Sequence, residues 1–249
     1  MSQNNQDQDR ATIRTSLSSK TWFGFDLDDT LHEFRKASAQ ASSAVFTAIH
    51  EESPNVIIDE LKSSYRDILV STTAGAFADG RTSADYRRER FSLLLQAHGL
   101  EAQPERLARL LEVYKSTLRA ALTLKPGALQ LLRRIKSLGK KVIVVTEGPH
   151  DAQQWTVEEL GLGRYVDVLV TTNEVGLSKV DGLFPAVLER YGVVAEDMVY
   201  VGDNENRDVV PAQAAGVLAL LYDEKGGCRL DDCAALRVDS LGKLEDLLG

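Results

Sequence analysis

Residues 21–31 read TWFGFDLDDTL and join a short apolar segment to three closely spaced carboxylates. The apolar and aromatic part, residues 21–26, predicts a buried β-strand that stops in a loop. Two carboxylates about 4 Å apart repel each other by roughly 4 kcal/mol at an effective dielectric constant near 20. Asp26, Asp28 and Asp29 therefore form either a solvent-facing turn, or a site where one carboxyl group stays protonated or a divalent cation binds.

The sequence that follows changes its periodicity once. Residues 33–122 show helical patterns without a convincing strand, in the stretches RKASAQASSAVFTAIHEE, DELKSSYRDILV, SADYRRERFSLLLQAHG and PERLARLLEVYKSTLRAAL. After Lys125-Pro126-Gly127, predicted helices at 128–138, 152–160, 182–191 and 206–215 alternate with apolar strands at 141–145, 166–170, 198–201 and 217–221. Buried strands joined by helical crossovers indicate a parallel sheet.

The predicted fold class is therefore α/β, with a Rossmann-like parallel sheet core and a helical cap inserted after the first strand. The core comprises residues 21–32 and 123–249, the cap comprises residues 33–122, and residues 1–20 are expected to form a flexible tail. An insert placed after the carboxyl end of a strand lies over the crevice where open α/β sheets bind ligands.

Composition limits the partners of this chain. Its 249 residues are 43% hydrophobic and 27% charged, which is typical of a globular protein. The formal charge of −8 argues against nucleic-acid binding but is compatible with a small phosphorylated substrate held by local cations. No apolar run approaches the roughly 18 residues that cross a bilayer. The lack of a secretory signal and the single pair Cys228 and Cys233, interpreted as structural bystanders, predict a reducing, cytoplasmic location.

The segment FDLDDTL at residues 25–31 resembles the DxDxT signature of haloacid dehalogenase-like phosphatases. The resemblance implies that Asp26 is the nucleophile, which forms an aspartyl phosphate and also binds Mg²⁺. It implies that Asp28 is the general acid and base and that the backbone carbonyl of Asp28 is a second Mg²⁺ ligand.

Residues 142–146, VIVVT, and 173–179, NEVGLSK, resemble the second and third motifs of this family. The resemblance implies that Thr146 binds a phosphoryl oxygen, with backbone N–H groups at Gly148 and near His150 directed at the same anion. Lys179 would neutralise the nucleophile and the phosphoryl group. Taken alone, a Thr after a strand is usually a helix cap and a loop lysine is usually solvated.

Residues 199–208, VYVGDNENRD, resemble the acidic fourth motif. Asp203 would be a direct Mg²⁺ ligand, and Asp208 would support Lys179 or metal-bound water, or would only favour the helix dipole. The four segments occur in the order of the family's motifs, each at the end of a predicted parallel strand.

Two positions depart from the family pattern. Glu147, which replaces a common Asn, is counted with Thr146, Gly148 and Lys179 as an expected substrate-binding residue, although its carboxylate would either repel the substrate phosphate or point at the cap. Val180 replaces the Pro after the lysine. His32 and Glu33, where the chain enters the insert, are expected to serve as a hinge rather than to contact substrate.

The predicted function is Mg²⁺-dependent hydrolysis of a small phosphomonoester, with a nucleotide or a sugar phosphate as the expected substrate and with no membrane or nucleic-acid partner. A 2-haloacid dehalogenase is the first alternative, although the second acid, Asp28, argues against it. A phosphomutase would use the same residues, and a catalytically silent binding protein is disfavoured because the acidic and basic motif residues are retained. The sequence does not distinguish a monomer from a homodimer.

Overall fold

The computed structural model describes residues 14–72, 77, 79–224, 226 and 236–248. Residues 1–13 of the predicted tail, together with Cys228 and Cys233, lie outside the described residues.

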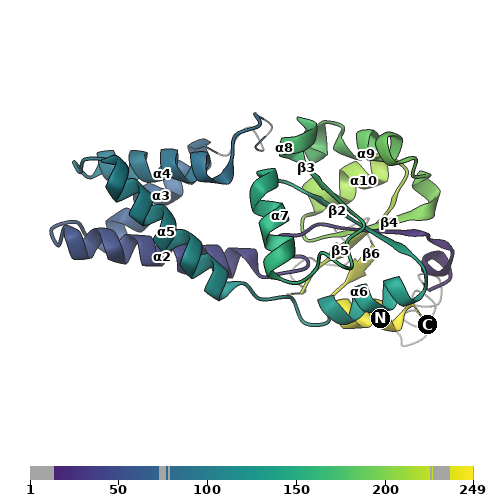
Figure 1. The fold of residues 1–249 in the computed structure, drawn as a ribbon. Helices are drawn as coiled ribbons and strands as arrows, with labels where there is room; N and C mark the ends of the chain where they lie inside the picture. The colour runs from purple at the N-terminus through teal and green to yellow at the C-terminus, as the bar shows by residue number, and fades with distance from the viewer. Residues whose placement is uncertain (1–13, 73–76, 78, 225, 227–235, 249) are drawn as a thin grey trace.

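Six parallel strands form one sheet in the order β3-β2-β1-β4-β5-β6 (Figure 1). The strands are β1 (Trp22–Phe25), β2 (Lys141–Thr146), β3 (Val168–Thr171), β4 (Met198–Gly202), β5 (Leu218–Tyr222) and β6 (Leu236–Val238). The predicted α/β fold with a parallel sheet is confirmed. The strands β2 and β3 add to one side of β1, and β4, β5 and β6 then add to its other side. Such a reversal of strand order opens a crevice at the carboxyl ends of the strands.

Alternating side chains of each strand pack on opposite faces of the sheet, as the two-residue period of a strand requires. Phe23, Phe25, Val142 and Val144 belong to the core beneath α6 (Ala128–Ser137) and α11 (Leu241–Asp246). Their neighbours, among them Ile143 and Tyr200, belong to a second core with α9 (Leu183–Tyr191) and α10 (Val210–Ala214). Figure 1 shows these two pairs of helices on opposite sides of the sheet.

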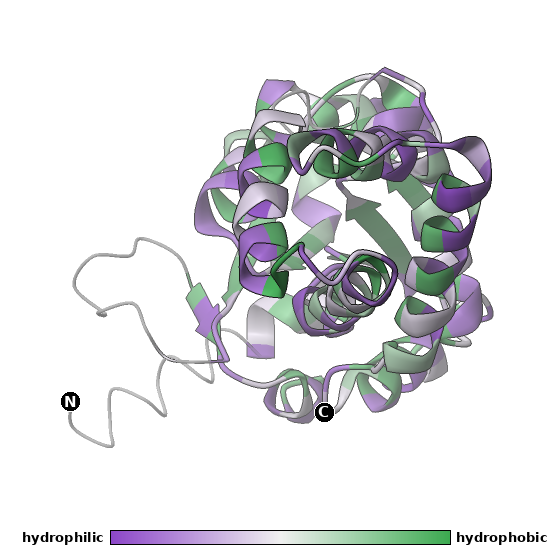
Figure 2. Ribbon diagram, turned by 90° about the vertical axis from the view of Figure 1, so that its left-hand side faces the viewer, coloured by the Kyte–Doolittle hydropathy of each residue, from purple (hydrophilic) through white to green (hydrophobic). Residues whose placement is uncertain are grey.

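Four helices form a separate unit beside the sheet: α2 (Phe34–Glu52), α3 (Ile58–Thr72), α4 (Ser83–Ala97) and α5 (Pro104–Ala121). Apolar residues of all four make a core of their own, which includes Phe46, Leu61, Phe91 and Leu110. This unit faces the viewer in Figure 2, where hydrophilic and hydrophobic residues are mixed along the helices, as expected for helices that bury only one face. Trp155 of α7 (His150–Glu159) packs against this core and links it to the sheet.

The chain enters and leaves the four-helix unit at adjacent points. Glu33 N–H donates to the Thr123 carbonyl over 2.9 Å, and Lys125 N–H donates to the Leu31 carbonyl over 2.9 Å. His32 forms an antiparallel bridge with Leu124. These contacts lie where the sequence predicts the ends of the insert, while the division into domains stays a prediction.

Three local predictions differ from the structure. Residues 14–19 are helical and Leu17 is fully buried in the core beneath α6, so this part of the expected tail is not loose. The predicted helix at 206–215 is a π-helical turn, η3 (Glu205–Val209), followed by the short α10. β6 and α11 were not predicted from the sequence. For β6, a strand of three residues gives too short a pattern to recognise. Among the described helices, none has the length and apolar character of a membrane span.

Candidate active site

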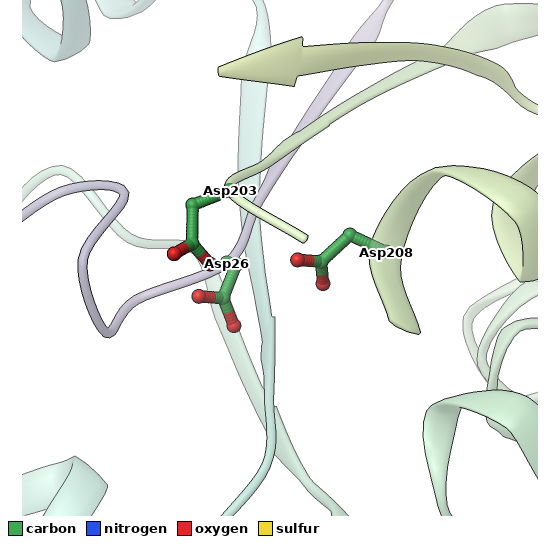
Figure 3. Close-up of side chains that lie close together, drawn as sticks. All are labelled: Asp26, Asp203 and Asp208. Carbon is green, nitrogen blue, oxygen red and sulfur yellow. The ribbon is translucent and has the colours of Figure 1, made fainter. Parts of the chain in front are cut away.

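The carboxyl ends of the central strands bring the predicted acidic residues together. Asp26 follows β1 and its N–H donates to the Val201 carbonyl of β4 over 2.9 Å. Asp203 follows β4, and Asp208 comes from η3. Figure 3 shows the carboxylates of Asp26, Asp203 and Asp208 converging, and their oxygens lie within 4.8 Å of one another.

Lys179 is buried beside two of these carboxylates, with a relative accessibility of 3%. Its Nζ lies 2.6 Å from Asp26 Oδ1 and 2.5 Å from Asp208 Oδ1. It begins the 3₁₀ turn η1 (Lys179–Asp181) although Val180 replaces the usual Pro, and Val180 itself is exposed. Lys179 is therefore not a solvated loop residue, and Asp208 contacts the lysine as one of its predicted roles requires.

Burial and charge shift the proton equilibria of this cluster. Burial raises the pKa of Asp26 well above its ordinary value, and although Lys179 opposes the shift, the carboxylates of Asp208 and Asp28 add to it. Burial also lowers the pKa of Lys179, but attraction to Asp26 and Asp208 outweighs this and holds that pKa well above the ordinary value. The lysine is therefore a cation. Together with Arg35, which pairs with Asp29 and Asp203, it faces the four carboxyl groups of Asp26, Asp29, Asp203 and Asp208.

This charge imbalance fits a divalent cation. Asp203 accepts a hydrogen bond of 2.9 Å from Arg35 Nη2, yet burial still raises the pKa of the Asp203 carboxyl. Carboxylate oxygens are the ligands that Mg²⁺ prefers, and a cation between Asp26 and Asp203 would offset their mutual repulsion. Asp208 is less available as a ligand, because its two oxygens already accept hydrogen bonds from Lys179 and from the Asn204 N–H.

Asp28 occupies a different position from the other acids. Its Oδ1 lies 2.8 Å from His32 Nε2, and its Oδ2 accepts a hydrogen bond of 3.2 Å from Gln153 Nε2. These contacts fix the orientation of a carboxyl group that lines the cavity described below. His32 is fully buried and does not line that cavity, so its ring positions Asp28 while its backbone lies at the expected hinge. The contact between His32 and Asp28 was not predicted from the sequence, where the spacing of four residues between them was its only sign.

Thr146 ends β2 with a buried hydroxyl oxygen that has no hydrogen-bond partner. The N-cap of the following helix α7 is Pro149, so Thr146 is not a helix cap. Gly148 also lines the cavity, but its N–H donates to Thr172 Oγ1 over 3.1 Å, and the His150 N–H donates to Asn173 Oδ1 over 3.3 Å. In this structure neither N–H group is free, and their role as phosphate donors stays a prediction.

Glu147 does not present an unbalanced charge to the site. Its Oε2 accepts a hydrogen bond of 3.0 Å from Arg207 Nη1, and both side chains line the cavity. Arg207 was not identified from the sequence. The ion pair offsets the repulsion that Glu147 would otherwise exert on a phosphate.

A cavity of about 350 Å³ joins these groups to the four-helix unit. Its sheet side contains the motif residues Asp26, Asp28, Thr146, Glu147, Gly148, Lys179, Asp203 and Asp208. Its helical side contains tyrosines and three arginines: Tyr65, Tyr86 and Tyr114, with Arg35 of α2 and Arg87 and Arg90 of α4. None of these arginines was predicted as a site residue from the sequence, because charged residues on a helix usually face solvent.

Comparisons with known proteins agree with this geometry. The chain is 27% identical to a ribulose-1,5-bisphosphate 5-phosphatase of Halopiger xanaduensis, over 90% of this chain and 97% of the relative. It is 29% identical to the pyrimidine 5'-nucleotidase YjjG of Escherichia coli, over 91% and 97% of the two chains. The fold matches that of YfnB, a putative hydrolase of Bacillus subtilis solved with magnesium, with a TM-score of 0.70 at 23% identity over 92% and 98% of the two chains.

Both curated relatives are phosphoric monoester hydrolases by name, and the predicted enzyme class is confirmed. Residues 21–216 match the family model described as haloacid dehalogenase-like hydrolase, and this stretch contains all four motifs. The chain thus belongs to the haloacid dehalogenase-like hydrolases.

Proposed function

We propose that this chain is a Mg²⁺-dependent phosphatase that hydrolyses a small phosphomonoester through an aspartyl phosphate on Asp26. The observation that carries the proposal is the environment of the Asp26 carboxylate. It lies 2.6 Å from Lys179 and within 4.8 Å of Asp203, while Asp28 is held separately by His32 and Gln153. A nucleophile, a charge-neutralising lysine and a separate proton-transfer group are the parts that phosphoryl transfer to a carboxylate requires.

In the first half-reaction, Asp26 attacks phosphorus while Asp28 protonates the oxygen of the leaving alcohol. The Lys179 ammonium and the free Thr146 hydroxyl bind the phosphoryl oxygens as charge develops on them. When bound by Asp26, Asp203 and the Asp28 carbonyl, Mg²⁺ would supply positive charge that reduces repulsion between the nucleophile and the phosphoryl group. In the second half-reaction, Asp28 takes a proton from the water that attacks the aspartyl phosphate.

We assign residues 33–122 the role of a cap. The four helices contribute one side of the cavity, and the adjacent crossings at Glu33–Thr123 and Leu31–Lys125 would let the unit move as a body. Closure would exclude water and select the leaving group. The expected substrates are a nucleotide or a sugar phosphate, which are also the kinds of compound in the names of the curated relatives.

The proposal is tested by phosphate release from a panel of phosphomonoesters, with Mg²⁺ and with EDTA. We expect turnover that EDTA abolishes, no turnover for Asp26→Asn, and a loss of about 100- to 10,000-fold for Asp28→Asn, the usual contribution of a positioned acid or base. Asp59→Asn is the control, because Asp59 is 87% exposed on α3.

Absence of turnover on the whole panel, together with no binding of a beryllium fluoride phosphoryl analogue, would refute the proposal. Chloride release from 2-haloacids without metal would indicate a dehalogenase instead. Transfer of the phosphoryl group to a second sugar phosphate rather than to water would indicate a phosphomutase.

A further inference from the structure

Two arginines of α4, Arg87 and Arg90, line the helical side of the cavity, whereas the acidic motif residues line its sheet side. They lie three residues apart on α4 and therefore on the same face of the helix. Like charges at this spacing destabilise a helix unless an anion lies between them. Within the described part of the chain, no carboxylate lies within ion-pair distance of either guanidinium, although the protein carries a formal charge of −8.

Arg90 is buried, with a relative accessibility of 8%. Its Nε donates to Thr72 Oγ1 over 3.0 Å, but its Nη2 is buried without a hydrogen-bond partner. The guanidinium lies 5.6 Å from the ring centroid of Phe77 and 5.9 Å from that of Tyr86. Aromatic faces attract a cation, but they do not satisfy its N–H donors, so burial of Nη2 is costly in the absence of a ligand.

Arg87 presents a second guanidinium beside the first. Its Nη1 donates to Ser83 Oγ over 2.9 Å, and its guanidinium carbon lies 4.9 Å from the ring centroid of Tyr114. The neighbouring phenols do not act as anions, because burial raises the pKa of Tyr114 and raises the pKa of Tyr65 to about 12. Among the described residues, Asp151 reaches Arg87 only through Ser83, whose Oγ donates to Asp151 over 2.7 Å. Arg90 has no carboxylate of the described residues at ion-pair distance.

We propose that the substrate carries a second anionic group, a carboxylate or a phosphate, which Arg90 and Arg87 bind at the end remote from the scissile phosphoryl group. This inference rests on the proposed function and specifies its substrate class. Arginine offers several N–H donors in a planar fork that matches the oxygens of either anion. The inference favours a compound with two anionic ends, as the word bisphosphate implies for one relative, over a nucleoside monophosphate.

Matched substrate pairs test this proposal. Glycerol 3-phosphate and 3-phosphoglycerate differ by a carboxylate at the remote end, and ribulose 5-phosphate and ribulose 1,5-bisphosphate differ by a phosphate. We expect kcat/KM to favour one or both anionic members by about 10- to 100-fold, the usual effect of hydrogen bonds to a charged group. The pair with the larger ratio identifies the kind of anion.

Variants separate recognition from folding. Arg90→Met keeps an unbranched side chain but removes the charge. It should lower kcat/KM for the anionic member to within about threefold of the value for its neutral partner. Arg87→Met should act in the same direction. The readout is the ratio of kcat/KM for the anionic member to that for its neutral partner, and the melting temperature reports any loss of folding. Arg88→Met is the matched control on α4, because Arg88 is 54% exposed and pairs with Asp85 outside the cavity.

Equal kcat/KM for both members of each pair in the unmodified enzyme would overturn the inference and leave the proposed phosphatase intact. An equal loss on both members in Arg90→Met would show a structural role only. If no substrate is turned over, calorimetric titration of Asp26→Asn with the same pairs in Mg²⁺ still decides. Tighter binding of the anionic members that Arg90→Met removes supports the subsite, and equal binding rejects it.

Discussion

Lys179 determines the charge balance of the site at the level of single residues. Its ammonium contacts Asp26 and Asp208 at once, and all three side chains are buried. A buried ion pair is costly to break, because removal of one partner leaves the other charge in a medium of low dielectric constant. The lysine therefore serves stability as well as chemistry.

Lys179→Met should lower the free energy of unfolding by roughly 3–5 kcal/mol, since Asp26 and Asp208 would remain buried without their cation. Urea denaturation without Mg²⁺ measures the change. Lys62→Met is the control, because Lys62 is 49% exposed in a surface pair with Asp59, and it should change the value by about 1 kcal/mol or less. Equal values for the two variants would contradict the prediction.

At the level of elements, the end of β4 and the π-helical turn η3 are packed against each other. A Cβ atom on Gly202 would lie 2.4 Å from Asp208 Cγ, so only glycine lets the Asp208 carboxyl reach Lys179 from this turn. π-helical turns are rare and often occur at functional sites.

Gly202→Ala should displace Asp208, weaken its contact with Lys179 and lower kcat at least about tenfold, with a loss of roughly 1–3 kcal/mol in stability from overpacking. Phosphate release and thermal unfolding measure the two effects. Gly163→Ala is the matched control, because a Cβ atom there would meet nothing within 4 Å. Unchanged kcat in Gly202→Ala would show that Asp208 tolerates the displacement.

Asp167 joins three elements at the start of the sheet. It precedes β3, accepts hydrogen bonds of 2.6 Å from Lys136 of α6, and accepts one of 2.7 Å from the Val142 N–H of β2. Burial opposes ionisation of this carboxyl, but these hydrogen bonds outweigh the effect and hold its pKa below the ordinary value. The ionised form therefore stabilises the fold.

Because the pKa is lower in the folded chain, the contribution of Asp167 is complete above the unfolded pKa of about 3.9 and is lost as pH falls through the folded value. Asp167→Asn should cost roughly 1 kcal/mol at pH 7, and this difference from the unmodified protein should shrink below about pH 4. Unfolding titrations of both proteins at pH 7 and at pH values below about 4 measure this difference in stability. Asp239→Asn, which affects an exposed pair with Lys243, should show no comparable dependence.

At the level of the whole molecule, the cavity between the sheet and the four-helix unit has a cluster of carboxylates on its sheet side and arginines on its helical side. Asp26, Asp203 and Asp208 cluster on the sheet side, whereas Arg87 and Arg90 line the helical side. A substrate with two anionic groups therefore needs an added cation beside the carboxylates of the sheet side. On the helical side, Arg87 and Arg90 already supply positive charge.

Mg²⁺ should stabilise the folded chain even without substrate, because a ligand that binds only the folded state shifts unfolding by about 2.7 kcal/mol at 100 times its Kd. Thermal unfolding with Mg²⁺ and then with excess EDTA measures this shift. Asp203→Asn should remove most of the shift, while Asp59→Asn, on the exposed surface of α3, should retain it. A Mg²⁺-dependent shift of equal size in both variants would place the cation elsewhere.

Much of the fold followed from local patterns. Strand periodicity and the alternation with helices predicted β1 to β5 to within a few residues, because buried parallel strands have a regular composition. The order of the motifs along these strands predicted which acids meet, because parallel strands place their carboxyl ends at one edge. The helix at residues 14–19 and η3 were not predicted, since Leu17 and Asp208 take their positions from packing against distant residues.

The sequence by itself thus determined the α/β class, the family and the candidates Asp26, Asp28, Thr146, Lys179 and Asp203. Only the tertiary structure decided which charged side chains are buried and what they contact: Asp28 with His32, Glu147 with Arg207, and Arg90 with a buried Nη2 that has no hydrogen-bond partner among the described residues. The physical reason is that a charge is inexpensive in water and costly in a protein interior. Whether a given Arg or Asp contributes to stability or to binding therefore depends on which other elements of the fold exclude water from it.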